Sequence, residues 1–321
     1  MFSKLPELFG RNFATSYFIP IVVFLLASLV IFKDLTFFPF AISLSATDQI
    51  EILLGTTIIS LFAWIGGFLL VSINRNIIRL MEGYGKYNPA NFLMNLEKRY
   101  YRKLKRRISM LDEKYIIFLE KSQQPPSDLV IKRNKLLREF VERFPDEERW
   151  LLPTSFGNTV RAFEVYPRIM YGIDSIPAWE HLLAVIPEDY RKLIDDSKAQ
   201  VDFWANVWIL SILFVLEYIF ITSHIHAINN LWILISAIAL VFVAFSRARI
   251  AAVEWGKRVK AAFDVFLPEL HKKLGFKNPK SEEETKQMWR GFSQAVIYMI
   301  PSSLPNRSYF ETVEQDMDVI N

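Results

Sequence analysis

Glu217 and His224 are the residues in the apolar parts of this chain whose types and spacing could support proton or cation chemistry. An acid well inside an apolar segment usually faces a helix-bundle interior or a wet cavity. His224 follows Glu217 by two helical turns and lies on the same helix face. We expect either an outer cation or proton site here, or a Glu217 carboxyl that is hydrogen-bonded to a neighbouring helix. A metal site that adds His226 lacks a further good ligand, so we predict no metal.

A second candidate is the polar corner between Leu152 and Asp174. Gly157 and Asn158 begin a predicted helix, and free backbone amides at such a position can hold an anion. Arg161 and Glu164 follow at a spacing of three and can pair on one helix face. We interpret the corner either as a pocket for a ligand or a protein partner, or as a structural joint of the polar domain.

A basic run, KRYYRKLKRR, lies on one predicted helix after the second apolar stretch. Its three interpretations are a solvated helix face, contact with anionic headgroups and contact with nucleic acid. Each basic residue near an anionic bilayer is worth about 1 kcal/mol. Nucleic acid is disfavoured because no known binding fold accompanies the run. The residues expected to contact lipid or a partner are Lys98, Arg99, Arg102, Lys103, Arg106 and Arg107.

Several classes of chemistry have no residues to support them. The chain contains no cysteine, which excludes disulfides, thiolate metal sites and cysteine nucleophiles. It has no Gly-rich phosphate loop, nucleophile elbow, HExxH sequence or potassium-filter sequence. We therefore predict no catalytic residues, no cofactor and no enzyme activity.

Four long apolar stretches must position these residues. They run from about 14 to 32, 50 to 73, 203 to 223 and 231 to 246. Each is close to the roughly 20 residues with which a helix crosses a bilayer. No small-residue cleavage site follows the first stretch, so we expect a retained membrane helix rather than a signal peptide. Residues 35–44 are apolar but too short to span, and we expect an interfacial loop or a re-entrant piece.

The second stretch carries small residues at spacings of four, three and four. They are Thr56, Ser60, Ala63 and Gly67. Such a face lets helix backbones approach closely in lipid. It predicts either packing within one subunit or an intersubunit, pore-lining face. In the pore-lining interpretation, the hydrophobic constrictions are Phe62, Phe68 and Leu69.

Charge placement orients the chain in the membrane. The long central segment and the C-terminal tail hold an excess of Lys and Arg over Asp and Glu, whereas the two short connections between paired stretches are poor in basic residues. The positive-inside rule therefore places both termini and the central domain in the cytoplasm.

Helical patterning continues beyond three of the apolar stretches. The second continues until Gly83, the third begins at Pro187, and the fourth meets no breaker before Pro268. Helices are predicted in the central segment over residues 91–121, 127–144, 155–165 and 177–185. The fold class is therefore an all-α membrane protein of two transmembrane hairpins, in which helices two, three and four extend into a helical cytoplasmic domain. The predicted domains are 1–82, 83–186, 187–267 and a tail, 268–321.

The sequence PTSFGNTVRAFEVYPRIMYGID, continued by IPAWEHLLAVIPEDYRKLIDDSKAQVDFW, resembles a recurrent pattern of uncharacterised bacterial multi-pass membrane proteins. This resemblance implies a bacterial inner-membrane protein with four helices and a central cytoplasmic helical domain. It implies no activity and carries no catalytic residue.

Two functional hypotheses follow. The leading one is a homo-oligomeric pore or channel that its cytoplasmic domain gates. The alternative is a membrane-anchored scaffold that docks a cytoplasmic protein partner or an anionic lipid surface. Membrane lipids are the expected partners in both hypotheses.

Overall fold

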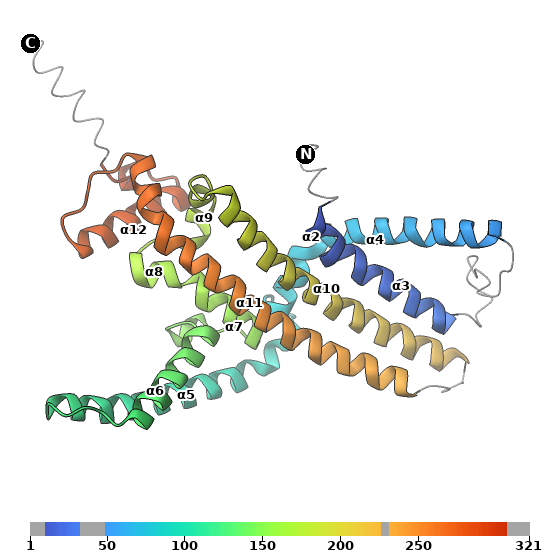
Figure 1. Cartoon of the computed structure of the whole chain (residues 1–321), viewed down its shortest axis with the longest axis horizontal. Helices are drawn as coiled ribbons and strands as arrows, with labels where there is room; N and C mark the ends of the chain where they lie inside the picture. Colours follow the sequence, from blue (N-terminus) through green and yellow to red (C-terminus); the bar gives the residue numbers. More distant parts are fainter. Residues whose placement is uncertain (1–9, 33–48, 226–230, 307–321) are drawn as a thin grey trace, which may run out of the picture. The chain divides into compact units, whose positions relative to one another are not determined.

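The structure is a computed structural model that describes residues 10–32, 49–225 and 231–306. Every regular element in these ranges is a helix, which agrees with the predicted all-α class (Figure 1). The chain forms two compact units. The first, which we call the membrane unit, consists of Met1–Asn88 and Asp196–Ala252, and the second, the helical unit, consists of Pro89–Asp195 and Val253–Asn321.

Four helical segments are long and apolar enough to cross a membrane, as predicted. They are Arg11–Leu29, Gly55–Glu82, Glu188–Ser223 and Leu231–Leu274. The first span consists of α2 (Arg11–Phe13), the π-helix η2 (Ala14–Phe18) and α3 (Ile19–Phe32). The other three are α4 (Gln49–Glu82), α10 (Glu188–Ile225) and α11 (Leu231–Leu274). The chain therefore has the helices of a multi-pass membrane protein. Residues 35–44 lie outside the described ranges.

In the membrane unit, α4 packs closely against the first span. A methyl group added to Gly66 would lie 2.7 Å from a side-chain carbon of Ile21. At Gly67 it would lie 3.2 Å from the ring of Phe13, which stacks on Trp64. Small residues permit this approach of two backbones, which larger side chains would prevent.

Polar pairs join the first span to α10. They are Arg11 with Asp196 at 3.2 Å, Tyr17 with Asp202 at 3.0 Å, and Ser28 with Glu217 at 2.7 Å. Residue numbers rise together along both helices, so the first span and α10 run in the same direction. The predicted succession of two membrane hairpins requires this parallel arrangement of their first helices.

The helical unit is built around a helical hairpin. Its helices are α5 (Met94–Glu120) and α6 (Ser127–Arg143), which lie side by side (Figure 1). Their amphipathic faces, together with the segment that follows α6, bury a shared core of Tyr101, Leu104, Ile108, Leu136, Phe144 and Leu151. One short helix, η3 (Pro89–Leu93), precedes the hairpin. Four short helices come after it: η4 (Glu148–Trp150), α7 (Ser155–Glu164), α8 (Tyr166–Tyr171) and α9 (Ser175–Leu183).

The C-terminal part of the helical unit differs from the predicted tail. Helix α11 continues through Pro268 to Leu274, although proline removes a backbone hydrogen bond and displaces the preceding carbonyl. Leu267 and Leu270 are buried on either side of Pro268 and hold this last part of the helix in place. A further helix, α12 (Glu282–Tyr298), packs on α8 and α9, and the short η5 (Pro301–Ser303) follows it.

The predicted domain boundaries also differ from the two units. The predicted divisions lie at Gly83, Pro187 and Pro268, whereas the chain passes from one unit to the other after Asn88 and at points within α10 and α11. Both helices are continuous through those points because neither contains a breaker there.

Candidate functional site

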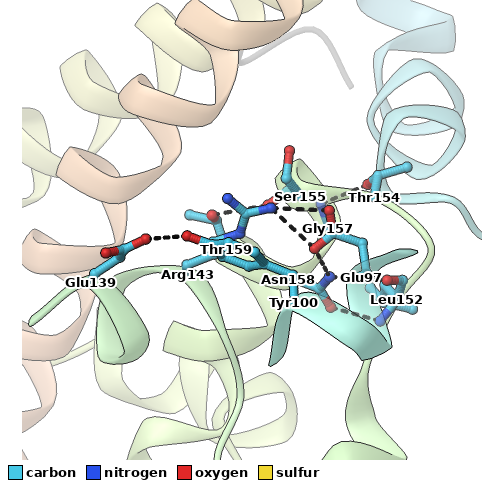
Figure 2. Close-up of polar contacts among 10 residues, drawn as sticks. All are labelled: Glu97, Tyr100, Glu139, Arg143, Leu152, Thr154, Ser155, Gly157, Asn158 and Thr159. Carbon is cyan, nitrogen blue, oxygen red and sulfur yellow. Dashed lines mark hydrogen bonds and ion pairs between the residues drawn. The ribbon is translucent and has the colours of Figure 1, made fainter. Parts of the chain in front are cut away.

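Asn158 is the centre of the predicted corner, and its side chain is fully buried. Its amide oxygen accepts from the Leu152 backbone N–H at 2.7 Å, and its amide nitrogen donates to the Leu152 carbonyl at 3.0 Å (Figure 2). One side chain thus satisfies both backbone groups of a residue in the loop before α7. This pairing fixes the loop against the helix.

The same amide connects α7 to the hairpin. Asn158 donates to Glu97 of α5 at 3.1 Å, and Glu97 forms an ion pair with Arg143 of α6 at 3.0 Å (Figure 2). The Arg143 guanidinium lies 4.3 Å from the centre of the Tyr100 ring, and the Tyr100 hydroxyl donates to Glu139. This hydrogen bond, together with burial, raises the pKa of the Tyr100 phenol. Three helices therefore meet in one connected polar network.

The helix-start amides in the corner are already bonded within the chain. The Gly157 N–H donates to the Thr154 hydroxyl at 2.9 Å, and the Asn158 N–H donates to the Thr154 carbonyl at 3.0 Å. Thr154 is the N-cap of α7, an arrangement that satisfies otherwise orphaned donors. These two amides consequently serve the helix start rather than an anion.

Arg161 and Glu164 line a cavity of about 330 Å³, to whose wall Gly157 and Asn158 do not contribute. They form an ion pair at 3.3 Å, the pairing that their spacing predicts. Burial raises the pKa of the Glu164 carboxyl, and Arg161 partly opposes that shift. Arg168, which also lines the cavity, is 5.0 Å from the Trp150 ring centre and pairs with Asp174. The charges of this cavity wall are thus paired with one another.

Three members of the basic run share one stripe on α5. Arg99, Lys103 and Arg106 are exposed and recur at spacings of four and three. At 3.6 residues per turn, this stripe lies opposite the buried stripe of Tyr101 and Leu104. Among the described residues, no ion pair involves the three basic side chains.

The other basic residues of the run lie elsewhere on the helix. Arg102 is exposed and forms an ion pair with Glu148, which lowers the pKa of the Glu148 carboxyl. Arg107 is exposed and Lys98 is partly exposed.

The small-residue face of α4 divides into two halves. Ala63 and Gly67 are buried within the chain, whereas Thr56 and Ser60 are exposed. The hydroxyl of Ser60 donates to the Thr56 carbonyl on the same helix at 2.7 Å. The proposed constriction residues Phe62, Phe68 and Leu69 are also exposed, by 45%, 37% and 59%.

Glu217 accepts a hydrogen bond from Ser28 of α3 at 2.7 Å. This contact with a neighbouring helix corresponds to the second of its two predicted interpretations. His224 belongs to α10, and His226 lies outside the described residues.

Asp202 is a buried acid that the sequence reasoning did not select. It is 6% exposed and accepts hydrogen bonds from Tyr17, Asn74 and Lys198. The sequence does contain a hint of this cluster, because Asn74 and Asp202 are polar residues that directly adjoin the ends of two apolar stretches. Spacing along the sequence does not show that these ends meet in the fold.

Comparison with protein-family models gives no match for this chain, and neither the curated proteins nor the solved structures contain a match.

Proposed function

We propose that the chain is a bacterial inner-membrane docking protein that lies with both termini in the cytoplasm. Its four spans hold it in the bilayer, and the exposed face of α5 binds anionic phospholipid headgroups. The observation that supports this function most directly is the stripe of Arg99, Lys103 and Arg106 on that face.

The stripe has the composition of a membrane-interface helix. Exposed apolar side chains extend the stripe at both ends. Leu96 is 56% exposed and Met110 is 55% exposed, and each is three or four residues from the nearest basic residue of the stripe. A basic stripe with apolar neighbours fits the boundary between headgroups and acyl chains. Three basic residues at about 1 kcal/mol each supply roughly 3 kcal/mol before entropic costs.

The position of α5 in the chain favours lipid over a soluble partner. Helix α4 ends at Glu82, and η3 begins seven residues later at Pro89. The intervening and following residues include Tyr87 and Phe92, which are 91% and 74% exposed. Exposed aromatic side chains close to a membrane exit are typical of the bilayer–water interface.

The test uses a fluorescent label on the natural cysteine-free background. The full-length Met110→Cys variant carries an environment-sensitive dye and is placed in nanodiscs of phosphatidylcholine, with or without phosphatidylglycerol. We expect a blue shift with the anionic lipid, and we expect high salt to reduce the shift because it screens exposed charges.

Two charge variants of the labelled protein decide the proposal. Substitution of Arg99, Lys103 and Arg106 by glutamine should abolish the blue shift. The matched control removes the same number of positive charges from the exposed residues Lys132, Lys135 and Arg138 of α6. An equal loss in both variants, or no response to phosphatidylglycerol in the unsubstituted protein, would refute headgroup binding by α5.

A homo-oligomeric pore remains the second candidate, and the exposed Thr56–Ser60 half of the α4 face supports it. A Ser60→Cys variant should form disulfide-linked dimers in liposomes if this half lies between subunits. Ile65→Cys, on another side of α4, is the matched control because Ile65 is 49% exposed. A strict monomer in nanodiscs would count against the pore.

Ion flux into liposomes tests conduction by this second candidate. Gly67→Leu is unsuitable for locating the pathway, because Gly67 packs against Phe13 and the larger side chain would disturb the fold. Ser60→Leu is the better variant, since Ser60 is exposed. Reduced flux in this variant would support a pathway beside α4, and absence of flux from the unsubstituted protein would favour the docking function.

A further inference from the structure

The membrane unit holds a buried polar cluster around Asp202. The Tyr17 hydroxyl donates to one carboxylate oxygen at 3.0 Å, and the Asn74 amide donates to the other at 3.0 Å. The Lys198 ammonium lies 2.8 and 3.1 Å from the two oxygens. Asp202 is 6% exposed, so these groups rather than bulk water set its surroundings.

Two buried amide oxygens accompany this carboxylate. Asn74 is 8% exposed and Asn206 is fully buried. Among the described residues, no donor lies within hydrogen-bond distance of either Oδ1 atom. Such acceptors are costly to bury without a partner. They call for a ligand that carries positive charge or a donor.

The orientation of both amides is determined by their neighbours. The Asn74 nitrogen donates to Asp202, and the Asn206 nitrogen donates to the Ser16 carbonyl at 2.8 Å. Rotation of either amide by half a turn would place its oxygen against another oxygen. The two Oδ1 atoms are therefore the unpartnered ends.

These oxygens belong to one small region. Asn206 follows Asp202 by one helical turn on the same face of α10, and Asn74 is hydrogen-bonded to Asp202. Ser16 and Tyr17 belong to the π-helix η2, and π-helical turns occur frequently at functional sites. Carboxylate and amide oxygens are hard ligands that suit alkali and alkaline-earth cations rather than thiophilic metals.

We propose that Asp202, Asn74 and Asn206 form a binding site for a monovalent alkali cation, for which Lys198 competes. A single carboxylate balances one positive charge, which favours a monovalent ion over a divalent one. The Lys198 side chain is 44% exposed, and its flexible stem allows the ammonium to turn toward solvent when the ion binds. The site is independent of headgroup binding by α5.

The test is binding of radioactive Na⁺ to the purified full-length chain in nanodiscs, with choline chloride to hold ionic strength constant. We expect saturable binding that Asp202→Asn abolishes. Lys198→Met removes the competing ammonium and should lower the dissociation constant about tenfold, an effect typical of a partly buried ion pair. Asp196→Asn is the matched control, because Asp196 is a carboxylate of the same helix that pairs with Arg11 and Asn12 instead.

The Lys198→Met variant keeps the test decisive even if Asp202→Asn does not fold. Saturable Na⁺ binding that tightens in Lys198→Met and is unchanged in Asp196→Asn would establish the site. Absence of saturable binding in both the unsubstituted protein and Lys198→Met would overturn it, and would leave buried water as the partner of the amide oxygens.

Discussion

Replacement of Asn158 by leucine should loosen the corner of the helical unit. Leucine fills a similar volume but cannot bond to the Leu152 N–H, the Leu152 carbonyl or the Glu97 carboxylate. Each unsatisfied, partly buried backbone group costs about 1 kcal/mol or more, and the weakened Glu97–Arg143 pair adds a similar amount. We therefore expect a loss of about 3 kcal/mol in the free energy of local opening.

Hydrogen exchange of the Leu152 amide measures this loss directly. Since 1.4 kcal/mol corresponds to a factor of ten, 3 kcal/mol predicts exchange faster by about 100-fold. The assay is mass spectrometry of the peptide that contains Leu152, from full-length protein in nanodiscs. Thr154→Ala removes one capping bond and should cost only about 1 kcal/mol, and Asn134→Leu on the exposed side of α6 should change little.

Asn158→Asp separates hydrogen bonding from charge. Aspartate retains an acceptor for Leu152 N–H but places a second carboxylate beside Glu97. Like charges raise the pKa of one carboxyl in such a pair, so folding favours its protonated form. Stability should therefore increase as pH falls and decrease as pH rises. Exchange of Leu152 within threefold of the unsubstituted protein in both Asn158 variants would refute the structural role of this side chain.

Three further predictions concern the thermal melting of the full-length protein. Gly256→Ala should lower stability by about 1–2 kcal/mol, because the new methyl group would lie 2.5 Å from a ring carbon of Phe163, which outweighs the gain in helix propensity. Phe163→Leu in the same chain should recover part of that loss, and simple additivity of the two changes would argue against direct contact. Gly172→Ala should cost about 2 kcal/mol, since Gly172 has φ of +81° and a methyl group there would lie 2.6 Å from the Lys286 carbonyl oxygen. A melting temperature equal to that of the unsubstituted protein would exclude this conflict. Burial raises the pKa of Glu164 above its ordinary 4.5, so its ionisation should reduce stability as pH rises through and above that value. Glu164→Gln should lack this pH dependence, and an unchanged slope would assign it to other groups.

Local sequence patterns predicted the helices well where periodicity or a breaker determined them. The end of α4 at Glu82 and the start of α10 at Glu188 follow the predicted signals at Gly83 and Pro187. Pro268 is an exception, because burial of its neighbours keeps α11 helical beyond it. The helix predicted over 177–185 begins earlier in the structure, because α9 starts at Ser175, whose hydroxyl donates to the Glu164 carbonyl.

Helix α12 was missed although its signal is present in the sequence. Ser281 followed by Glu284 is a capping-box pattern, and the Glu284 N–H does donate to the Ser281 hydroxyl. Trp289 and Phe292 then continue at a helical spacing and are both buried. The predicted tail began at the helix breaker Pro268, whereas a few large aromatic side chains are enough to pack a helix beyond it.

The candidate sites were harder to predict because they combine distant segments. The sequence identified Asn158 as a helix-start residue, but its function as a three-way hydrogen-bonding partner depends on Glu97, which is 61 positions away. Asp202 and Asn74 stand at the ends of apolar stretches, where a polar residue ordinarily faces water. Their burial results from the packing of α4, α10 and the first span around them. The small residues of α4 predict that this helix packs closely, but no local pattern shows which helices it meets.

The parallel pairing of the first span with α10 has a consequence for biosynthesis. Tyr17 and Asp202 are separated by 185 positions in the chain. At about 5–20 residues per second, the ribosome needs roughly 10–40 seconds to make the intervening segment. In the proposed membrane arrangement, the first hairpin would reside in the bilayer during that interval without the partners of Ser16, Tyr17 and Ser28. Completion of the membrane unit must therefore wait for α10, and the first hairpin alone is the stage at which membrane quality control would meet unpaired polar groups.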